Sequence, residues 1–395
     1  MASLTENKAG CVLLLKVPKK WDEHLVRKLS LLYSVQVIYA LPIIKDIGHS
    51  GLIRQINRAV IDNKLSLVLF CADFYAGIDH QFITRISKTA KKVLITFDDT
   101  LLHDFNSITS AACDLVLTTC PLSALKYREK GYEAHAINYE MSNLKNEGNK
   151  KEIDVLFFGS VTPDRKEFLD YIIKEGVSLK NVGHKEHVVG LPKEEILKLI
   201  SKSKIVLNLS KSRTTKVLNL PSESTYRYYY QFKGRIILAG LKGAACVSEY
   251  SPGQELIFNE DELPPFFTKE ECVKILKRLL TNDELLAKYT SKFTSKVYEL
   301  WDDKKNFEPI YKAIEKTEHR RVKLIRFPYW YMRIAAKQII LRNLKLSTLV
   351  KSIFQFNIVF SIIRNSNFLI KFLIIFESFI NVLWYSIIFT FKSKK

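Results

Sequence analysis

The sequence predicts an α/β protein made of two doubly wound domains, a short linker between them and a helical tail at the carboxyl end. Short runs of leucine, valine and isoleucine alternate with longer amphipathic stretches from residue 11 onward. This alternation is typical of a parallel sheet with crossover helices. A polar stretch at 142–152 interrupts it and indicates a linker, after which a second series begins. The chain has 395 residues, more than one ordinary domain needs.

Five runs predict the strands of the first domain. They are nearly continuous in apolar residues, as strands buried on both faces of a sheet must be. They lie at 11–17, 35–41, 65–71, 92–97 and 113–119. Between them, the segment 21–33 repeats apolar residues at helical spacing. The segment 121–132 starts with Pro121 and ends at Gly131, which also favours a helix. The predicted first domain covers residues 1–141.

The second domain follows the same organisation without repeating the sequence. Its predicted strands lie at 153–159, 204–210 and 244–248, with a weaker one near 177–183. Its predicted helices lie near 164–175, 193–202, 232–242 and 269–280. We place this domain at 153–316 and the tail at 317–395. Open α/β sheets bind ligands beyond the carboxyl ends of their strands, so the polar residues after the strands are the candidate site residues.

Composition argues against several functional classes. None of the 14 glycines builds a phosphate loop or a dinucleotide fingerprint. The six cysteines lie mostly within apolar runs and form no C-x-x-C pair, which is typical of reduced thiols in a core. His184 and His187 lack neighbours that would complete a zinc site, so no structural metal is expected. The first residues lack the features of a secretion signal, which predicts a cytoplasmic location.

Candidate ligands for an anionic group follow two strands of the second domain. Gly159 and Ser160 end the first strand, and Arg165 lies near the start of the next helix. A glycine permits close approach of the backbone, and helix-start amides attract phosphate. Ser210 and Lys211 follow the second strand and offer a hydroxyl and a cation to a diphosphate. An ordinary turn and a solvated loop have the same composition, so both interpretations stay open.

The stretch 221–258 adds aromatic, cationic and acidic residues. Four tyrosines in the run TYRYYYQ can stack on a nucleobase or sugar, or simply pack beside a helix. Arg235 opens the apolar helix that follows. Glu249 and Glu255 flank a Ser-Pro-Gly turn, where a carboxylate can accept hydrogen bonds from ribose hydroxyls or lie at an ordinary surface.

The order of these segments resembles the GT-B glycosyltransferases, most of all the spore-maturation-protein-like group related to the "group 1" enzymes. The resemblance is carried by FFGS and the arginine after it, SKIVLNLS, YQFKGRIILAGLKGAACVSEYSPGQELIF, the acidic EDEL and ECVKILKRLLTNDELLAKYTSK. Upstream, TFDDTLLH and CDLVLTTCPLSALKYREKGYEAHAI are similar to the acceptor half of that group. The likeness covers roughly residues 10–310 and is strongest at 153–300.

The resemblance implies two Rossmann-like domains with a nucleotide-diphosphate sugar held mainly by the second. It also implies transfer to an acceptor in the cleft without a metal or other cofactor. On the matching positions, Gly159, Ser160 and Arg165 would lie near the diphosphate. Arg235 would lie near the phosphates or the helix that supports them, and Glu255 near the ribose.

The catalytic carboxylates are less evident. Many group 1 relatives carry two glutamates, eight residues apart, where this chain has Tyr230 and Leu238. In the first domain, Asp98 and Asp99 follow the run 92–97, with His103 four residues after Asp99. One of these groups can take the proton of the acceptor hydroxyl, or an aspartate can simply cap the next helix. Adjacent aspartates match poorly the D-x-D spacing of metal-dependent single-domain transferases.

The tail is basic and apolar. It holds fourteen lysines and arginines against Glu318 and Glu377, a net charge of +12 out of +20 for the chain. The aromatic triplet 329–331 beside Arg333 suits the headgroup boundary of an anionic membrane surface. The run 372–391 has the length of a membrane span, although Glu377 and Asn381 disfavour one. Three interpretations of the tail stay open: helices at the membrane interface, a membrane span, and packing against a partner protein. The apolar composition of the tail argues against nucleic acid as its partner.

The sequence therefore predicts a membrane-associated glycosyltransferase on the cytoplasmic face of the cell membrane. Its donor would be a nucleotide-diphosphate sugar, and its acceptor a lipid-linked glycan or a surface polysaccharide such as lipopolysaccharide. One alternative is a non-catalytic membrane-bound scaffold with a degenerate transferase fold, which the missing glutamate pair favours. Another is a sugar-nucleotide epimerase, which the tail disfavours.

Overall fold

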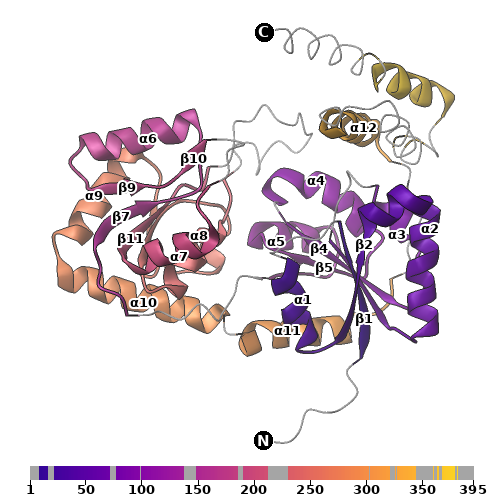
Figure 1. Cartoon of the computed structure of the whole chain (residues 1–395), viewed down its shortest axis with the longest axis horizontal. Coiled ribbons are helices and arrows are strands. Elements are labelled where there is room, and N and C mark those ends of the chain that lie inside the picture. Colours follow the sequence, from indigo (N-terminus) through magenta and orange to yellow (C-terminus); the bar gives the residue numbers. More distant parts are fainter. Residues whose placement is uncertain are drawn as a thin grey trace, which may run out of the picture.

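The computed structural model describes residues 9–16, 22–71, 77–97, 99–137, 148–185, 190–211, 230–301, 303–320, 325, 327–343, 359, 363, 367–378 and 380. Two parallel α/β domains follow one another along the chain, as the sequence predicts (Figure 1).

The first domain is built on a six-stranded parallel sheet of order β2-β1-β3-β4-β5-β6. Its strands are β1 (Gly10–Leu15), β2 (Ser34–Tyr39), β3 (Leu67–Cys71), β4 (Lys91–Thr96), β5 (Leu115–Thr118) and β6 (Ala134–Ala136). Its helices are α1 (Asp22–Ser30), α2 (Ala40–Asp62), α3 (His80–Ile83), α4 (Asp99–Ser110) and α5 (Pro121–Glu129). Helices on both faces explain the continuous apolar runs: Val12 and Leu14 lie in one core, whereas Cys11 and Leu13 lie in the other. The three-residue strand β6 is not among the predicted strands.

The second domain has a five-stranded parallel sheet of order β13-β12-β11-β7-β9. Its strands are β7 (Ile153–Phe157), β9 (Leu179–Asn181), β11 (Ser203–Asn208), β12 (Ala245–Glu249) and β13 (Pro265–Phe266), and β8 (Ser160–Val161) pairs with β10 (His184–Lys185) beside it. Its helices are α6 (Pro163–Lys174), α7 (Lys193–Ser201), α8 (Gly234–Leu241), α9 (Lys269–Leu280) and α10 (Asp283–Trp301). The four predicted strands and four predicted helices are all present. The two-residue strands are too short to leave a periodic signal.

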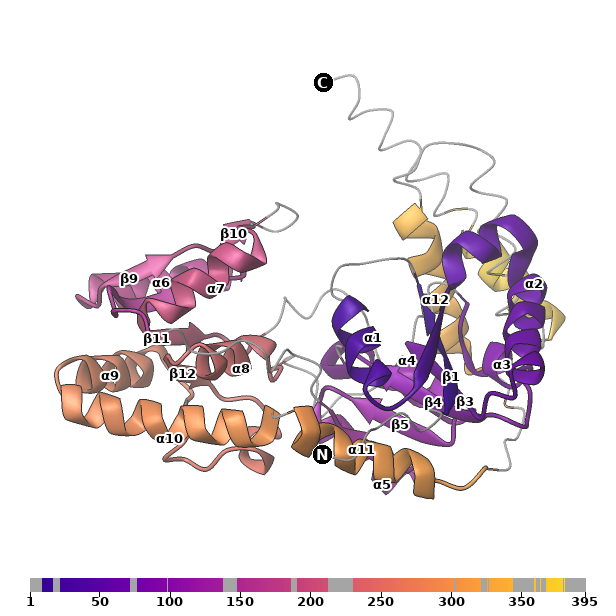
Figure 2. The ribbon, with the colours of Figure 1, turned by 60° about the horizontal axis from the view of Figure 1, so that its bottom comes forward.

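Helix α11 (Asp303–Lys316) returns to the first domain. Ile310 and Ile314 are buried in the core beside β1, β3, β4 and β5. The Lys91 ammonium donates to the carbonyls of Ile314 and Glu315, at 2.9 and 2.7 Å. Figures 1 and 2 show this orange helix alongside the first domain. The predicted bound of the second domain at 316 is therefore too late, because the chain leaves that domain after α10.

Helix α12 (Tyr329–Asn343) also packs on the first domain, against α4. Tyr331 is fully buried with its ring centroid 5.1 Å from that of Phe105, and Trp330 meets the same Phe105 ring edge-on at 5.5 Å. The expectation that the whole triplet 329–331 faces lipid headgroups is therefore wrong for Tyr331. Within the described residues no helix combines the length and apolarity that crossing a membrane requires. Of the run 372–391, residues 379 and 381–391 lie outside the described residues.

Candidate functional site

The second sheet has its switch point between β7 and β11. The chain leaves β7 through α6 to reach β9 on one side, and it comes back through α7 to β11 on the other. Connections that run to opposite sides leave a crevice at the carboxyl ends of the two strands, where such sheets bind ligands. The residues after β7 and β11 are therefore the centre of the candidate site, and they are the residues that the sequence selects.

Gly159 brings the backbone after β7 against a guanidinium group. Its φ of +108° is a conformation that other residues rarely adopt. A β-carbon at this position would lie 2.7 Å from Nη2 of Arg235, so a larger residue would displace that side chain. The next residue, Ser160, begins the short strand β8. Gly159 thus provides the close approach that the sequence predicts, with Arg235 as the neighbour.

Arg235 stands in the first turn of α8 and reaches across to β7. Its guanidinium carbon lies 5.3 Å from the ring centre of Phe157 and 5.5 Å from that of Phe158. The residue is half-buried, but its Nη1 atom is fully buried and has no hydrogen-bond partner among the residues that the structure describes. Burial, and secondly the charge of Arg165, lowers the pKa of the guanidinium to about 9. A buried cation with unused donors is a group to which an anion can bind.

The Arg165 side chain joins the loops after β7 and β11 by hydrogen bonds. Its guanidinium donates to the carbonyl oxygens of Ser160 and Lys211, both at 2.7 Å, and of Leu209 at 3.4 Å. The residue is only 8% exposed. Helix α6 holds it in place, since the Thr162 hydroxyl accepts from the Arg165 amide and caps the helix. Arg165 lies beside the predicted diphosphate position, but these bonds make it a residue that positions the loops.

Ser210, Lys211 and Glu249 form the second part of this edge. The Ser210 hydroxyl donates to the Glu249 carbonyl at 2.6 Å, and the Lys211 amide donates to the Glu249 carboxylate at 2.8 Å. Burial raises the pKa of Glu249, and hydrogen bonds from the backbone of Lys211 and Ser210 oppose that rise. Glu249 therefore holds the loop after β11 in place, and its contact with a ribose stays a prediction. The exposed Lys211 ammonium lies at the rim, 3.3 Å from the Asp164 carboxylate.

The turn after β12 carries Glu255 and touches the first domain. Glu255 is exposed and accepts a hydrogen bond from the Tyr250 hydroxyl at 3.3 Å. Gly253 has a φ of +91°, and a β-carbon there would lie 3.0 Å from the amide nitrogen of Leu122 at the start of α5. The second domain thus meets the first beside Glu255. The aromatic run before Tyr230 and the cationic residues after Lys211 lie outside the described residues.

Asp99 is the centre of a buried network in the first domain. Its carboxylate accepts hydrogen bonds from Thr96, Thr118 and Asn106 at 2.5–2.6 Å, and from the Tyr127 hydroxyl at 3.3 Å. The side chain is fully buried, which raises its pKa, while these bonds oppose the rise. This corrects the prediction of a catalytic Asp99, because its oxygens face protein donors and not an acceptor. Asp98 lies outside the described residues.

His103 belongs to the same interior. It is 3% exposed, and its ring lies 4.6 Å from that of Tyr127. Burial, and secondly the charges of Lys130 and Lys126, lowers the pKa of the imidazole to about 3. The side chain is therefore neutral and enclosed near neutral pH, which corrects its proposed role as the base for an acceptor hydroxyl.

The buried His103 makes stability depend on pH. Between about pH 6.5 and 3 the unfolded chain binds a proton at this imidazole and the folded chain does not. The stability that the neutral ring contributes is thus present above pH 6.5 and lost as the pH falls. Replacing His103 with phenylalanine should reduce the loss in unfolding free energy between pH 8 and pH 5 by about 2 kcal/mol. Urea unfolding of both proteins at the two pH values checks this, and an equal loss in both would contradict it.

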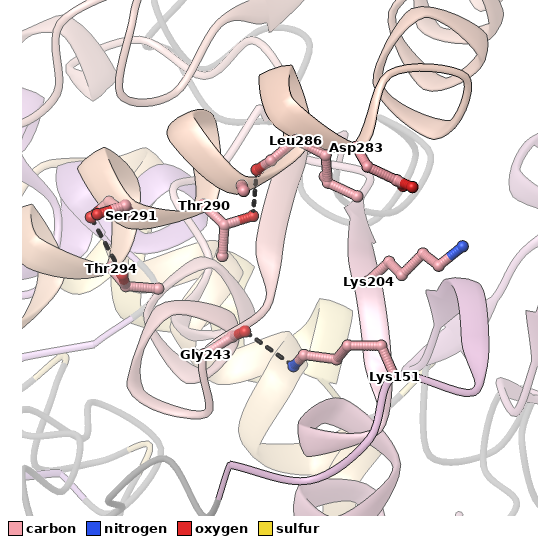
Figure 3. Close-up of a pocket in the computed structure, with 9 residues that line it drawn as sticks. Lys151, Lys204, Gly243, Asp283, Leu286, Thr290, Ser291 and Thr294 are labelled. Carbon is pink, nitrogen blue, oxygen red and sulfur yellow. Dashed lines mark hydrogen bonds between the residues drawn. The ribbon is translucent and has the colours of Figure 1, made fainter.

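Two pockets lie at the amino ends of the strands, one in each domain, on the side of the sheet away from the switch point. One, of about 430 Å³, lies between α10 and the amino ends of β7, β11 and β12 (Figure 3). Lys151 borders it and donates to the carbonyls of Ser201 and Gly243, at 2.9 and 2.8 Å. The other, of about 530 Å³, lies between α11 and the amino ends of β5 and β6. Neither adjoins the switch point. Among the described residues, no three histidine, cysteine or acidic side chains gather in a way that could hold a metal ion.

Comparison with known proteins finds similarity in the second domain and in the two-domain fold. Residues 144–301 match the family model described as "Glycosyl transferase-like". A search of the curated proteins finds no match. An α-glucosyltransferase solved with UDP-glucose and DNA containing an abasic site is similar in structure, with a TM-score of 0.53 at 12% identity over 78% of this chain and 99% of that one. HepE of Anabaena, solved with UDP-glucose, has a TM-score of 0.50 at 12% identity over 78% and 99% of the two chains.

The comparisons also include a longer protein. A variant of S. aureus TarM, solved with fondaparinux, α-GlcNAc-glycerol and UDP, has a TM-score of 0.49 at 14% identity. The match covers 68% of this chain but only 59% of TarM. The family match thus covers the second domain, and the two-domain fold that the sequence predicts is shared with the α-glucosyltransferase and HepE.

Two features of the site were missed in the sequence. Phe157 and Phe158 form the apolar support of Arg235, and Asp164 holds the ammonium of Lys211. The adjacent aromatic pair immediately before Gly159 was a visible signal for the first. Nothing in the spacing of Asp164 and Lys211 marks them as partners.

Proposed function

We propose that the protein transfers a sugar from a nucleotide-diphosphate donor to an acceptor held by the first domain. The observation that carries this proposal is the buried guanidinium of Arg235, which faces Gly159 at the switch point with unused donors. It stands at the start of α8, where the helix amides also favour an anion. These two features together suit the diphosphate of a nucleotide sugar.

The chemistry requires stabilisation of the leaving group. The bond between the sugar carbon and the diphosphate breaks, and a bond to the acceptor oxygen forms. The negative charge that develops on the diphosphate is met by Arg235, the α8 amides and Lys211 at the rim. We propose that these protein groups perform this task without a metal ion. Asp98 is the first-domain carboxylate that we propose as acceptor of the hydroxyl proton.

The donor is proposed to be a uridine diphosphate sugar. Two proteins of similar fold, the α-glucosyltransferase and HepE, were solved with UDP-glucose. UDP-glucose is therefore the first donor to test. Glu255, exposed at the turn after β12, keeps its proposed contact with the ribose.

The acceptor is proposed to be a lipid-linked glycan or surface polysaccharide at the cytoplasmic face of the cell membrane. The tail supports this proposal because it carries +12 of the net charge and because its helix α12 packs on α4 of the first domain. A tail attached to the acceptor domain would place that domain, and not the donor domain, beside the bilayer. No role for nucleic acid is proposed.

Calorimetric titration with UDP-glucose and UDP tests the donor site, and incubation of the full chain with radiolabelled UDP-glucose and membrane extracts tests transfer. We expect binding of both nucleotides and label in the lipid or polysaccharide fraction. The rival is a non-catalytic membrane scaffold, which Tyr230 and Leu238 favour because they occupy the places of the two glutamates. Absence of both binding and transfer across a panel of nucleotide sugars would leave the scaffold as the better account.

A further inference from the structure

The helical residues 368–378 and 380 carry an apolar face that the other described residues leave exposed. Six large apolar side chains on this helix are between 42 and 84% exposed. They are Phe368, Leu369, Phe372, Leu373, Phe376 and Ile380. Their spacing of one, four, five, eight and twelve residues places them along one side of a helix. We call them the outer face. Such a contiguous group is unusual on a protein surface and marks a site of interaction.

The opposite side of this helix is fixed to the protein. Ile374 and Ser378 are buried, and Ile374 lies in the apolar cluster that joins α12 to α4. The Arg333 Nε atom of α12 donates to both carboxylate oxygens of Glu377, at 3.0 and 2.8 Å. Figure 1 shows the yellow helix next to α12. The outer face is therefore held outward by a packed inner side and an ion pair.

The charges around the outer face identify what it can meet. Glu377 is the one acidic residue between 319 and 395, and Arg333 pairs with it. Lys371 lies on the same helix, and the tail as a whole carries +12. A second copy of this chain would bring another tail of the same charge, which disfavours self-association. Apolar side chains among cations suit an anionic bilayer, where both find partners.

We propose that the outer face docks sideways on an anionic bilayer and seats the first domain on it. A helix with one side buried on α12 presents only its other side, so it lies in the plane of the interface. In this position the carboxylate of Glu377 does not enter the lipid, because it faces Arg333 on the protein side of the helix. The free-energy cost of burying that charge in the bilayer is therefore avoided. This docking deepens the proposed function and rests on it for the lipid-linked acceptor. Docking itself does not require donor binding.

Flotation of the full chain with vesicles tests this docking. The variant Phe368→Ser, Phe372→Ser and Phe376→Ser removes half of the outer face. A matched control is Leu31→Ser, Ile61→Ser and Ile173→Ser, which removes three aliphatic side chains of 51–63% exposure in other elements. We expect the wild type and the control to float with phosphatidylglycerol-containing vesicles. We expect at least tenfold weaker flotation for the outer-face variant, and weak flotation of all three with phosphatidylcholine alone.

A second measurement avoids dependence on the folding of the triple variant. Phe368→Cys, labelled with an environment-sensitive dye, should shift its emission to the blue when anionic vesicles are added, whereas labelled Ile61→Cys should not. Equal flotation of all three proteins, no emission shift at residue 368, or a solution dimer that the outer-face variant dissociates would each overturn the proposal. UDP titration of the same proteins distinguishes failure of the proposed function from failure of docking. A protein that floats with anionic vesicles but does not bind UDP contradicts the proposed function and leaves the docking proposal intact.

Discussion

Replacement of Arg235 with alanine is expected to weaken the binding of UDP at least a hundredfold. Hydrogen bonds to charged groups contribute about 1.5–3 kcal/mol each, and two of them correspond to this factor or more. Burial already lowers the pKa of Arg235, so the folded protein disfavours its charge in the absence of an anion. We therefore expect the alanine variant to be at least as stable as the wild type. Calorimetry with UDP and thermal unfolding measure the two effects.

The control for this prediction is Arg278→Ala, which removes an exposed arginine from α9 of the same domain. It should leave UDP affinity unchanged. Arg235→Lys keeps the charge but loses the planar fork, so an intermediate affinity is expected. UDP affinity within threefold of the wild type in Arg235→Ala would contradict the assignment of this residue to the donor phosphates.

Replacement of Asp99 with alanine is expected to destabilise the first domain by about 3 kcal/mol or more, because four buried donors lose their acceptor. Urea unfolding measures this loss. Asp62→Asn, at the exposed end of α2, serves as control and should change the unfolding free energy by less than about 0.5 kcal/mol. UDP affinity should be retained in the folded fraction. An Asp99→Ala protein of wild-type stability that binds UDP but transfers no sugar would restore the catalytic role.

The strands could be predicted from sequence because both faces of each sheet are covered. A strand between two layers of helices must be apolar at nearly every position. Runs such as 11–17 and 65–71 have this character and are too short for buried helices. The end of the second domain could not be predicted in this way. The apolar side of α11 shows that Ile310 and Ile314 are buried somewhere, but not in which domain.

The roles of individual polar residues were harder to predict. Asp99 follows a strand at the edge where ligands bind, yet its partners Thr118 and Tyr127 come from two other elements, 19 and 28 residues further along the chain, that no local pattern connects with it. Arg165 has the charge that a diphosphate needs, but the carbonyl groups of two loops occupy it. Position along the chain identified the edge of the second sheet at which its switch point lies. It could not show which cations the fold itself uses.

The tail illustrates the same limit. Aromatic and cationic residues at 329–333 have the composition of a membrane boundary, but Tyr331 is buried on Phe105 and Arg333 pairs with Glu377. Composition records that a segment is apolar, and only the packing shows which side is covered. The uncovered side lies further along the chain, beginning at Phe368.

A crystal structure of the full chain with UDP bound would examine the donor site most directly. We predict that the diphosphate lies within hydrogen-bond distance of the Arg235 guanidinium and the first amides of α8, beside the backbone of Gly159. A nucleotide seated instead in the pocket beside Lys151, or one whose phosphates leave Arg235 without contact, would contradict it.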